Sequence, residues 1–88
     1  MSYEYDSFMV AFGRRVREMR LARGLTVRDM VLRHGYHDSY WRRVESGSQG
    51  LSMRSMLRLA DVFDVPLSEL VSNVEGKPEA KKPGSRKK

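Results

Sequence analysis

Apolar residues recur every three or four positions along most of the chain, and Gly or Pro separates each apolar segment from the next. This spacing puts the apolar side chains on one face of a helix, and the alternation typical of half-buried strands is absent. The first such segment spans about residues 7–23, where Ser7 is placed to cap a helix and Gly24 to end it. Its apolar positions are Phe8, Phe12, Val16 and Met19.

Two short helices are predicted next, joined by a turn that contains Gly35. The first of them spans about residues 26–34. Thr26 and Asp29 resemble a capping box, in which each side chain bonds the backbone N–H of the other residue. The positions expected to face inward are Met30 and Val31.

The second short helix spans about residues 38–46 and ends at Gly47. On a helical wheel Trp41 and Val44 share one face, with Glu45 beside them. We expect Trp41 to lie in the core. The opposite face carries Ser39, Arg42, Arg43 and Ser46.

Two more helices complete the predicted fold. One spans about residues 52–63 with Ser52 as its cap, and a short one begins at Pro66 and ends near Val71. The expected apolar stripe of the longer helix is Met53, Met56, Leu57, Ala60 and Phe63. The sequence therefore predicts a compact all-α domain of five helices.

Positive charge is concentrated at the C-terminal end. The net charge is +6, and residues 76–88 contribute +5 of it, with all five Lys and no large apolar residue. Such a segment cannot offset the entropy lost on ordering. We predict a disordered basic tail over residues 74–88, a folded domain over 8–73 and an N-terminal extension over 1–7. The tail is either an arm that binds phosphates or a solvated segment.

The residues that the chain lacks exclude several kinds of chemistry. Without Cys there is no disulfide scaffold, thiol nucleophile or Cys-based zinc site. Neither His has a second ligand at a metal-binding spacing, and no glycine-rich phosphate loop is present. We expect no enzyme activity, no metal and no cofactor. No apolar run approaches the roughly 20 residues that cross a bilayer, so we expect a cytoplasmic protein without a membrane partner.

The two helices around Gly35 form a helix-turn-helix pattern, which by itself is common in small helical domains. Further residues extend the pattern over about residues 8–72. They are Gly13, Val16, Arg17, Met19 and Arg20, then Gly24-Leu25-Thr26, then Tyr40-Trp41-Arg42-Arg43-Val44-Glu45-Ser46-Gly47, then Leu59-Ala60 and Val65-Pro66-Leu67-Ser68-Glu69-Leu70. In this order they resemble the lambda-repressor-like, or XRE/Cro, family of helix-turn-helix DNA-binding proteins. The short length and the loop ESGSQGLS at 45–52 look most similar to controller proteins of restriction-modification systems.

The resemblance implies a homodimer that binds double-stranded DNA and regulates transcription. The helix over residues 38–46 would enter the major groove of a palindromic operator. Such a protein, associated with the nucleoid, would be a restriction-modification controller or a small autoregulating repressor. The alternative is an antitoxin-type or adaptor protein whose main partner is another protein. Val27, where the family usually has Gln, and Asp38, near the family's Gln or Arg, favour that alternative slightly.

Candidate base contacts lie on the outward face of the helix over residues 38–46. An Arg side chain can bond O6 and N7 of guanine together, which points to Arg43 and Arg42 as readers of bases. Ser39 is short and approaches a base edge closely. Asp38 can accept from N4 of cytosine, or it caps the helix.

Candidate contacts to the DNA backbone surround that helix. Neutral polar groups and free N–H donors at helix starts are typical phosphate ligands. The same residues also serve as caps or turn residues in proteins that bind no DNA. The candidates are Thr26, His37, Tyr40, Ser46, Ser48, Gln49 and Arg54.

The resemblance also implies two structural features. Arg20 and Glu45 border the apolar faces of their helices and would form a partly buried ion pair that ties the helices together. A free Glu on a DNA-facing helix would repel phosphate, which favours this pairing. Several apolar residues near the C-terminal end of the domain would form the dimer interface. They are Val62, Val65, Leu67 and Leu70.

Overall fold

The computed structural model describes residues 4–74, and all of their regular structure is helical. The helices are α1 (Tyr5–Ala22), α2 (Val27–His34), α3 (Asp38–Ser46), α4 (Met53–Phe63) and α5 (Leu67–Leu70). No strand occurs between residues 4 and 74, and the prediction of an all-α fold with five helices is confirmed. Residues 1–3 and 75–88 lie outside the described residues, so the predicted basic tail does as well, apart from Val74.

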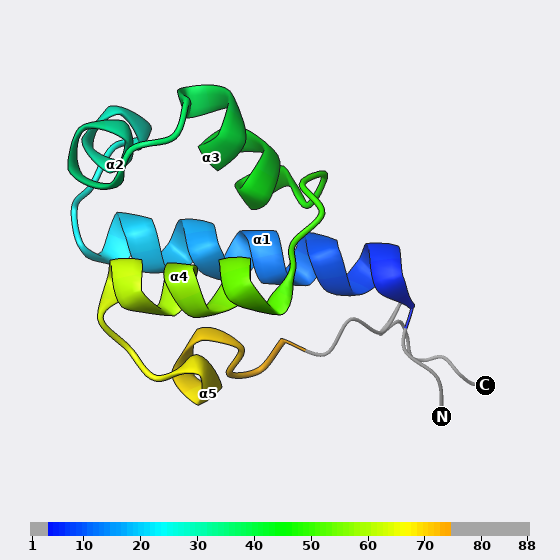
Figure 1. The fold of residues 1–88 in the computed structure, drawn as a ribbon. Helices are drawn as coiled ribbons and strands as arrows, with labels where there is room; N and C mark the ends of the chain where they lie inside the picture. The colour runs from blue at the N-terminus through cyan, green and yellow to red at the C-terminus, as the bar shows by residue number, and fades with distance from the viewer. Residues whose placement is uncertain (1–3, 75–88) are drawn as a thin grey trace.

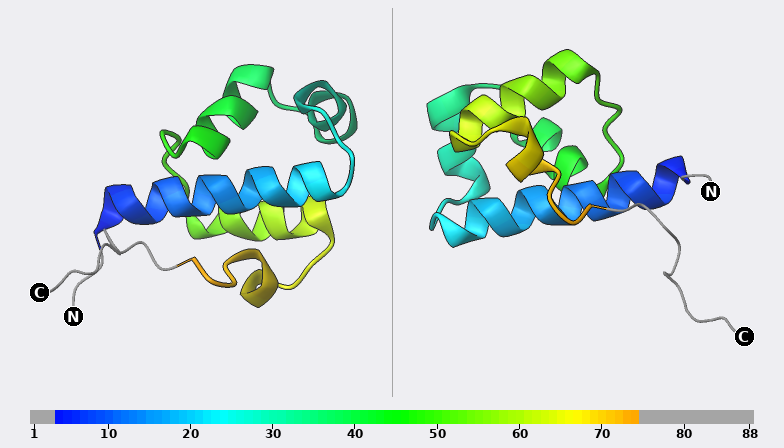
Figure 2. Two further views of the ribbon diagram at one scale, coloured as in Figure 1. Left: turned by 180° about the vertical axis from the view of Figure 1, so that it is seen from behind. Right: turned by 90° about the horizontal axis from the view of Figure 1, so that it is seen from below.

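The long helix α1 runs the length of the domain, and the other helices pack around it (Figure 1). Helices α2 and α3 cover one side of α1, while α4 and α5 lie next to each other on another side (Figure 2). Side chains from all five helices meet between these layers. The buried cluster consists of Phe12, Val16, Met19, Met30, Trp41, Val44, Leu59, Ala60, Phe63 and Leu70.

The first helix begins at Tyr5, earlier than the sequence predicted, because Glu4 caps it. The carboxylate of Glu4 accepts hydrogen bonds from the backbone N and from Oγ of Ser7, each at 2.9 Å. The expectation that Ser7 caps this helix is therefore wrong, since Ser7 lies inside the first turn and donates. The same two bonds lower the pKa of Glu4, because they favour its ionised form.

Caps fix the starts of α2 and α4 as the sequence predicted. Oγ1 of Thr26 accepts from the backbone N of Asp29 at 3.0 Å, and Oδ2 of Asp29 accepts from the backbone N of Thr26 at 2.8 Å. These two bonds complete the predicted capping box. Oγ of Ser52 accepts from the backbone N of Ser55 at 3.1 Å at the start of α4. Both helix starts are exposed, so their remaining N–H groups are free to meet an external acceptor.

The apolar stripe of α4 differs from the prediction at two positions. Met53 is 61% exposed and Leu57 is 50% exposed, whereas Leu59, which the prediction left out, is buried. The helix packs through one narrow stripe of Met56, Leu59, Ala60 and Phe63, which recur at spacings of three or four. Leu57 lies on the flank of this stripe and Met53 in the first turn of the helix, so neither is covered.

Candidate nucleic-acid interface

The third helix has one face in the core and the other in solvent. Trp41 and Val44 are 1% and 0% exposed, whereas the opposite face is fully open. The open face carries Ser39, Arg42, Arg43 and Ser46. The division into two faces that the sequence predicted for this helix is confirmed.

The buried face of α3 is held in place by aromatic contacts and one hydrogen bond. Nε1 of Trp41 donates to the carbonyl oxygen of Gly35 at 3.0 Å, which ties α3 to the end of α2. The ring of Tyr40 stacks on Tyr36 with centroids 4.5 Å apart, and both rings meet Trp41 edge-on. Burial raises the pKa of the Tyr40 hydroxyl, with the neighbouring Tyr36 adding to the shift. The ring of Tyr40 thus belongs mainly to this aromatic cluster.

Arg20 of α1 holds Glu45 of α3 in an ion pair. Nε and Nη2 of Arg20 donate to the two carboxylate oxygens at 2.6 and 3.0 Å, and each side chain is 9% exposed. Nη1 of Arg20 donates to the carbonyl oxygen of Leu25 at 2.7 Å. The hydrogen bonds to Glu45 raise the pKa of Arg20. The pair therefore ties α1 to α3 and neutralises a carboxylate that would otherwise repel phosphate.

The start of α3 carries an ion pair but no side-chain cap. His37 occupies the N-cap position and makes no capping hydrogen bond, so Asp38 is the first helical residue and not the cap. A carboxylate oxygen of Asp38 lies 3.8 Å from Nε of Arg42, one turn further along α3. Both side chains are about two-thirds exposed, so this pair contributes little to stability. Each of the two residues stays accessible to an external partner.

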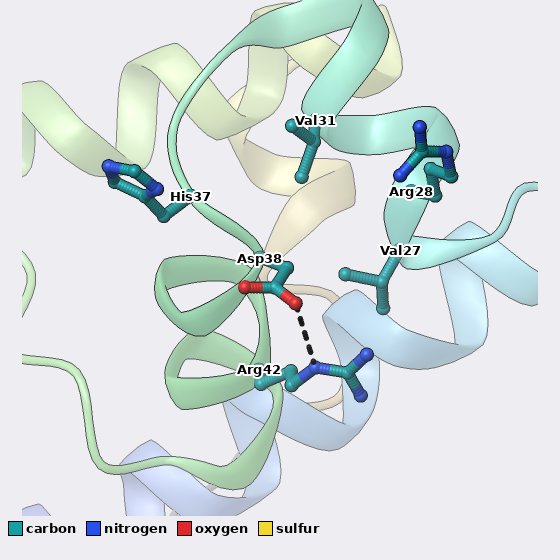
Figure 3. A pocket seen from close by; sticks show the side chains of 6 residues that line it. All are labelled: Val27, Arg28, Val31, His37, Asp38 and Arg42. Carbon is teal, nitrogen blue, oxygen red and sulfur yellow. Dashed lines mark ion pairs between the residues drawn. The ribbon is translucent and has the colours of Figure 1, made fainter.

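A hollow of about 420 Å³ lies between α2 and the start of α3. Figure 3 shows Val27 and Val31 beside it, with Arg28 and Arg42 toward one side and the His37 ring toward the other. Sequence reasoning missed Arg28, an exposed Arg in the first turn of α2. Its position in the first turn of α2, two residues after the helix cap Thr26, was the available signal.

The loop after α3 folds back onto Arg43. Nε of Arg43 donates to Oε1 of Gln49 at 2.9 Å. The carbonyl oxygen of Arg43 accepts from the backbone N of Ser48 at 2.9 Å and from Oγ of Ser46 at 3.2 Å. The hydroxyls of Ser46 and Ser48 lie 3.0 Å apart. The structure therefore brings four of the predicted contact residues together at the C-terminal end of α3.

The remaining predicted residues are more widely spread. Thr26 and Arg54 are exposed near the starts of α2 and α4, the helices that precede and follow α3 in the chain. Val62, Val65 and Leu67 are half-buried and pack against the core cluster. Leu70, expected in the dimer interface, is 0% exposed. It is part of the core cluster and has no accessible surface for contact with a second copy. Within the part of the chain that the structure describes, no helix is long and apolar enough to cross a membrane.

Comparison with known proteins gives one family and two similar structures. Residues 11–72 match the model of a family described as a helix-turn-helix domain. The restriction-modification controller protein C.AhdI from Aeromonas hydrophila is 37% identical, with 70% of this chain and 94% of that protein covered and a TM-score of 0.64. The DNA-binding domain of BldD is 24% identical, with coverages of 80% and 97% and a TM-score of 0.69, which is a likeness of fold alone. No curated protein matches the chain.

The family match covers α2 to α5 and most of α1, so it includes every helix that positions the open face of α3. The controller protein is matched over 94% of its own length. The resemblance drawn from the sequence is therefore confirmed, and the chain belongs to the lambda-repressor-like (XRE/Cro) family of helix-turn-helix DNA-binding proteins.

Proposed function

We propose that the protein is a sequence-specific regulator of transcription that binds double-stranded DNA as a homodimer. One observation carries the proposal. The open face of α3 holds two Arg and two Ser that take no part in the core, on a helix whose other face is fixed by Trp41 and Val44. A helix presented in this way fits the major groove of B-DNA. The likeness to a restriction-modification controller protein supports the same use.

Base edges would be read by side chains of α3. Arg43 and Arg42 are each able to donate to O6 and N7 of a guanine, and Ser39 is short enough to let the helix approach closely. Asp38 would accept from N4 of a cytosine. Its ion pair with Arg42 offsets part of the repulsion between this carboxylate and the phosphates.

Contacts to phosphates would fix the position of α3 along the groove. The exposed starts of α2 and α4 offer free backbone N–H groups and the positive ends of their helix dipoles. The hydroxyls of Ser46, at the end of α3, and of Ser48, in the loop after it, lie together near the carbonyl oxygen of Arg43. The proposed phosphate contacts are Thr26, His37, Tyr40, Ser46, Ser48 and Arg54.

A second copy would present a second α3 to the DNA. Val62, Val65 and Leu67 form the proposed contact between copies, with Leu70 supporting it from the core. A two-fold dimer binds a palindromic operator whose half-sites lie about one helical turn apart. Binding would then block or recruit RNA polymerase in the cytoplasm, as in a controller or a small autoregulating repressor.

The test is a titration of the purified protein onto a labelled duplex from upstream of its own gene, at two salt concentrations. A scrambled duplex of equal length is the control. We expect tight binding to the native duplex alone, with two copies bound per operator. The Arg43→Ala variant should bind about tenfold to a hundredfold more weakly, as expected for loss of a bidentate contact to guanine. Equal, weak and strongly salt-dependent binding to both duplexes would contradict sequence specificity and favour a protein partner.

A further inference from the structure

The side chain of Gln49 holds the guanidinium of Arg43, although the two residues lie on different segments. Nε of Arg43 donates to Oε1 of Gln49 at 2.9 Å, and Nε2 of Gln49 donates to the carbonyl oxygen of Gly50 at 3.1 Å. The amide is thus bonded through both of its polar atoms. The contact with Gly50 keeps the amide nitrogen turned away from Arg43, so that the oxygen faces the guanidinium.

The backbone of the same loop holds the other end of Arg43. Its carbonyl oxygen accepts from the backbone N of Ser48 at 2.9 Å and from the backbone N of Gln49 at 3.2 Å. Gly47, with a φ of +84°, allows the chain to reverse at this point. Gln49 is therefore bonded to Arg43 twice, through its side chain to Nε and through its backbone N to the carbonyl oxygen.

These bonds leave the outer edge of the guanidinium free. An Arg side chain has five N–H donors, and the bond to Gln49 uses only the one on Nε. Among residues 4–74, neither Nη1 nor Nη2 of Arg43 has a hydrogen-bond partner in the structure. The two Nη groups are the pair that bonds O6 and N7 of guanine end-on. Arg42 is held less firmly than Arg43. Its Nε lies 3.8 Å from Oδ2 of Asp38, beyond hydrogen-bond distance, and its side chain is 67% exposed.

We propose that Gln49 is a positioning residue for base recognition, which fixes the Arg43 side chain with both Nη groups presented to a guanine. The inference rests on the proposed function, and it replaces the expected phosphate contact of Gln49 with a contact inside the protein. A long, flexible side chain loses rotamer freedom when it binds a base. Because Gln49 restricts Arg43 before DNA arrives, less freedom is lost in the complex.

Two other roles for Gln49 make different predictions. If Gln49 bonds a phosphate directly, Gln49→Ala should weaken binding to every duplex equally and leave the salt dependence unchanged, because a neutral amide releases no counterion. If the bond between Arg43 and Gln49 must break before Arg43 reaches a base, Gln49 is inhibitory. Gln49→Ala should then raise the affinity. If Gln49 positions Arg43, Gln49→Ala should weaken binding only to duplexes in which Arg43 reads a base.

The experiment measures the affinity for the native duplex and for duplexes in which one guanine at a time is replaced by 7-deazaguanine, which lacks the N7 acceptor. The proteins are the wild type, Gln49→Ala, Arg43→Ala, the double variant and Gln49→Glu. The control is Ser72→Ala, a substitution at an exposed position that follows α5 in the chain. Thermal melting checks that each variant is folded.

We expect Gln49→Ala to weaken binding to the native duplex about fivefold to tenfold, the net contribution of one ordinary hydrogen bond. It should reduce discrimination at the same guanine as Arg43→Ala, and it should add nothing to Arg43→Ala in the double variant. Gln49→Glu keeps an acceptor for Nε. It should therefore keep the guanine preference while binding more weakly overall, because it adds a negative charge near the phosphates.

The inference is overturned if Gln49→Ala weakens binding to every duplex equally, strengthens binding, or adds fully to Arg43→Ala. If Arg43→Ala loses discrimination and Gln49→Ala does not, the positioning role fails while the proposed function stands. If the wild type prefers no duplex, the proposed function fails and the inference fails with it.

Discussion

Gly13 of α1 lies against the backbone of α3, so that a Cβ at this position would fall 2.5 Å from the carbonyl oxygen of Val44. The carbonyl oxygen of Glu45 would be equally close. Gly within a helix destabilises it by roughly 0.5–1 kcal/mol relative to Ala, and the close approach of the two helices explains why Gly is present here. The missing side chain lets α1 fix the position of the helix that we propose to read DNA.

Replacing Gly13 with Ala should therefore destabilise the fold, although Ala favours helices. We expect a loss of about 1–3 kcal/mol in the free energy of unfolding, because α3 must shift to admit the methyl group. Urea titration followed by the fluorescence of Trp41, the only Trp in the chain, measures it. Gly50→Ala is the matched control, because its Cβ would meet nothing closer than 4.0 Å. A Gly13→Ala variant as stable as Gly50→Ala would show that the helices are not in close contact.

The ion pair of Arg20 and Glu45 predicts an asymmetry between single and double variants. Arg20→Met or Glu45→Leu alone leaves one charge buried without its partner, and each should cost about 3–5 kcal/mol. The double variant removes both charges and should be more stable than either single one. Thermal melting of the three variants checks this. If the two single losses simply add in the double variant, the two side chains do not act as a pair.

Tyr36 adopts a left-handed backbone conformation, with a φ of +66°, which residues other than Gly rarely take. Its ring stacks on Tyr40, and its hydroxyl is hydrogen-bonded to Arg58. Tyr36→Gly and Tyr36→Ala both remove these contacts, but only Gly removes the backbone strain. We expect the Gly variant to be the more stable of the two by about 1 kcal/mol in chemical denaturation. The usual order, with Ala more stable, would contradict the strained turn.

The capping box predicts a dependence of stability on pH. Hydrogen bonds from the backbone and side chain of Thr26 lower the pKa of Asp29 in the folded state below its usual value of 3.8. The unfolded state therefore binds the proton first, so the stabilisation by Asp29 is complete above pH 3.8 and is lost as the pH falls toward the folded-state pKa. The difference in stability between the wild type and Asp29→Ala, measured by urea titration, should shrink over that range. A difference that grows toward acid pH would rule out this cap.

The order of the helices and the two faces of α3 could be predicted because they depend on local patterns. Trp41 and Val44 recur at helical spacing, and Thr26 and Asp29 have the spacing of a capping box. The prediction failed where two residues compete for one role. Glu4 and Ser7 are both able to cap a helix, and the carboxylate of Glu4 bonds both donors of Ser7. Leu57 and Leu59 are equally apolar, and only the packing of α4 decides which one is buried.

The sequence predicts which residues make up the candidate site, but not which of them bond to one another. Arg43 and Gln49 both carry long polar side chains, and sequence spacing places one on a helix and the other in a loop. Nothing in that spacing says that the loop reverses and brings the amide of Gln49 to Nε of Arg43. The contact depends on backbone bonds to the carbonyl oxygen of Arg43, which form only in the folded chain.

The most direct test of the account is methylation interference at guanine N7 on the native duplex, with the wild type and Arg43→Ala compared. Methylation blocks the major-groove acceptor that Arg43 is proposed to bond. The account predicts interference at one or more guanines in each of two half-sites about one helical turn apart, with one guanine per half-site no longer sensitive in Arg43→Ala. An identical pattern for the two proteins would contradict recognition of guanine by Arg43, and no interference at any guanine would contradict recognition of guanines through the open face of α3.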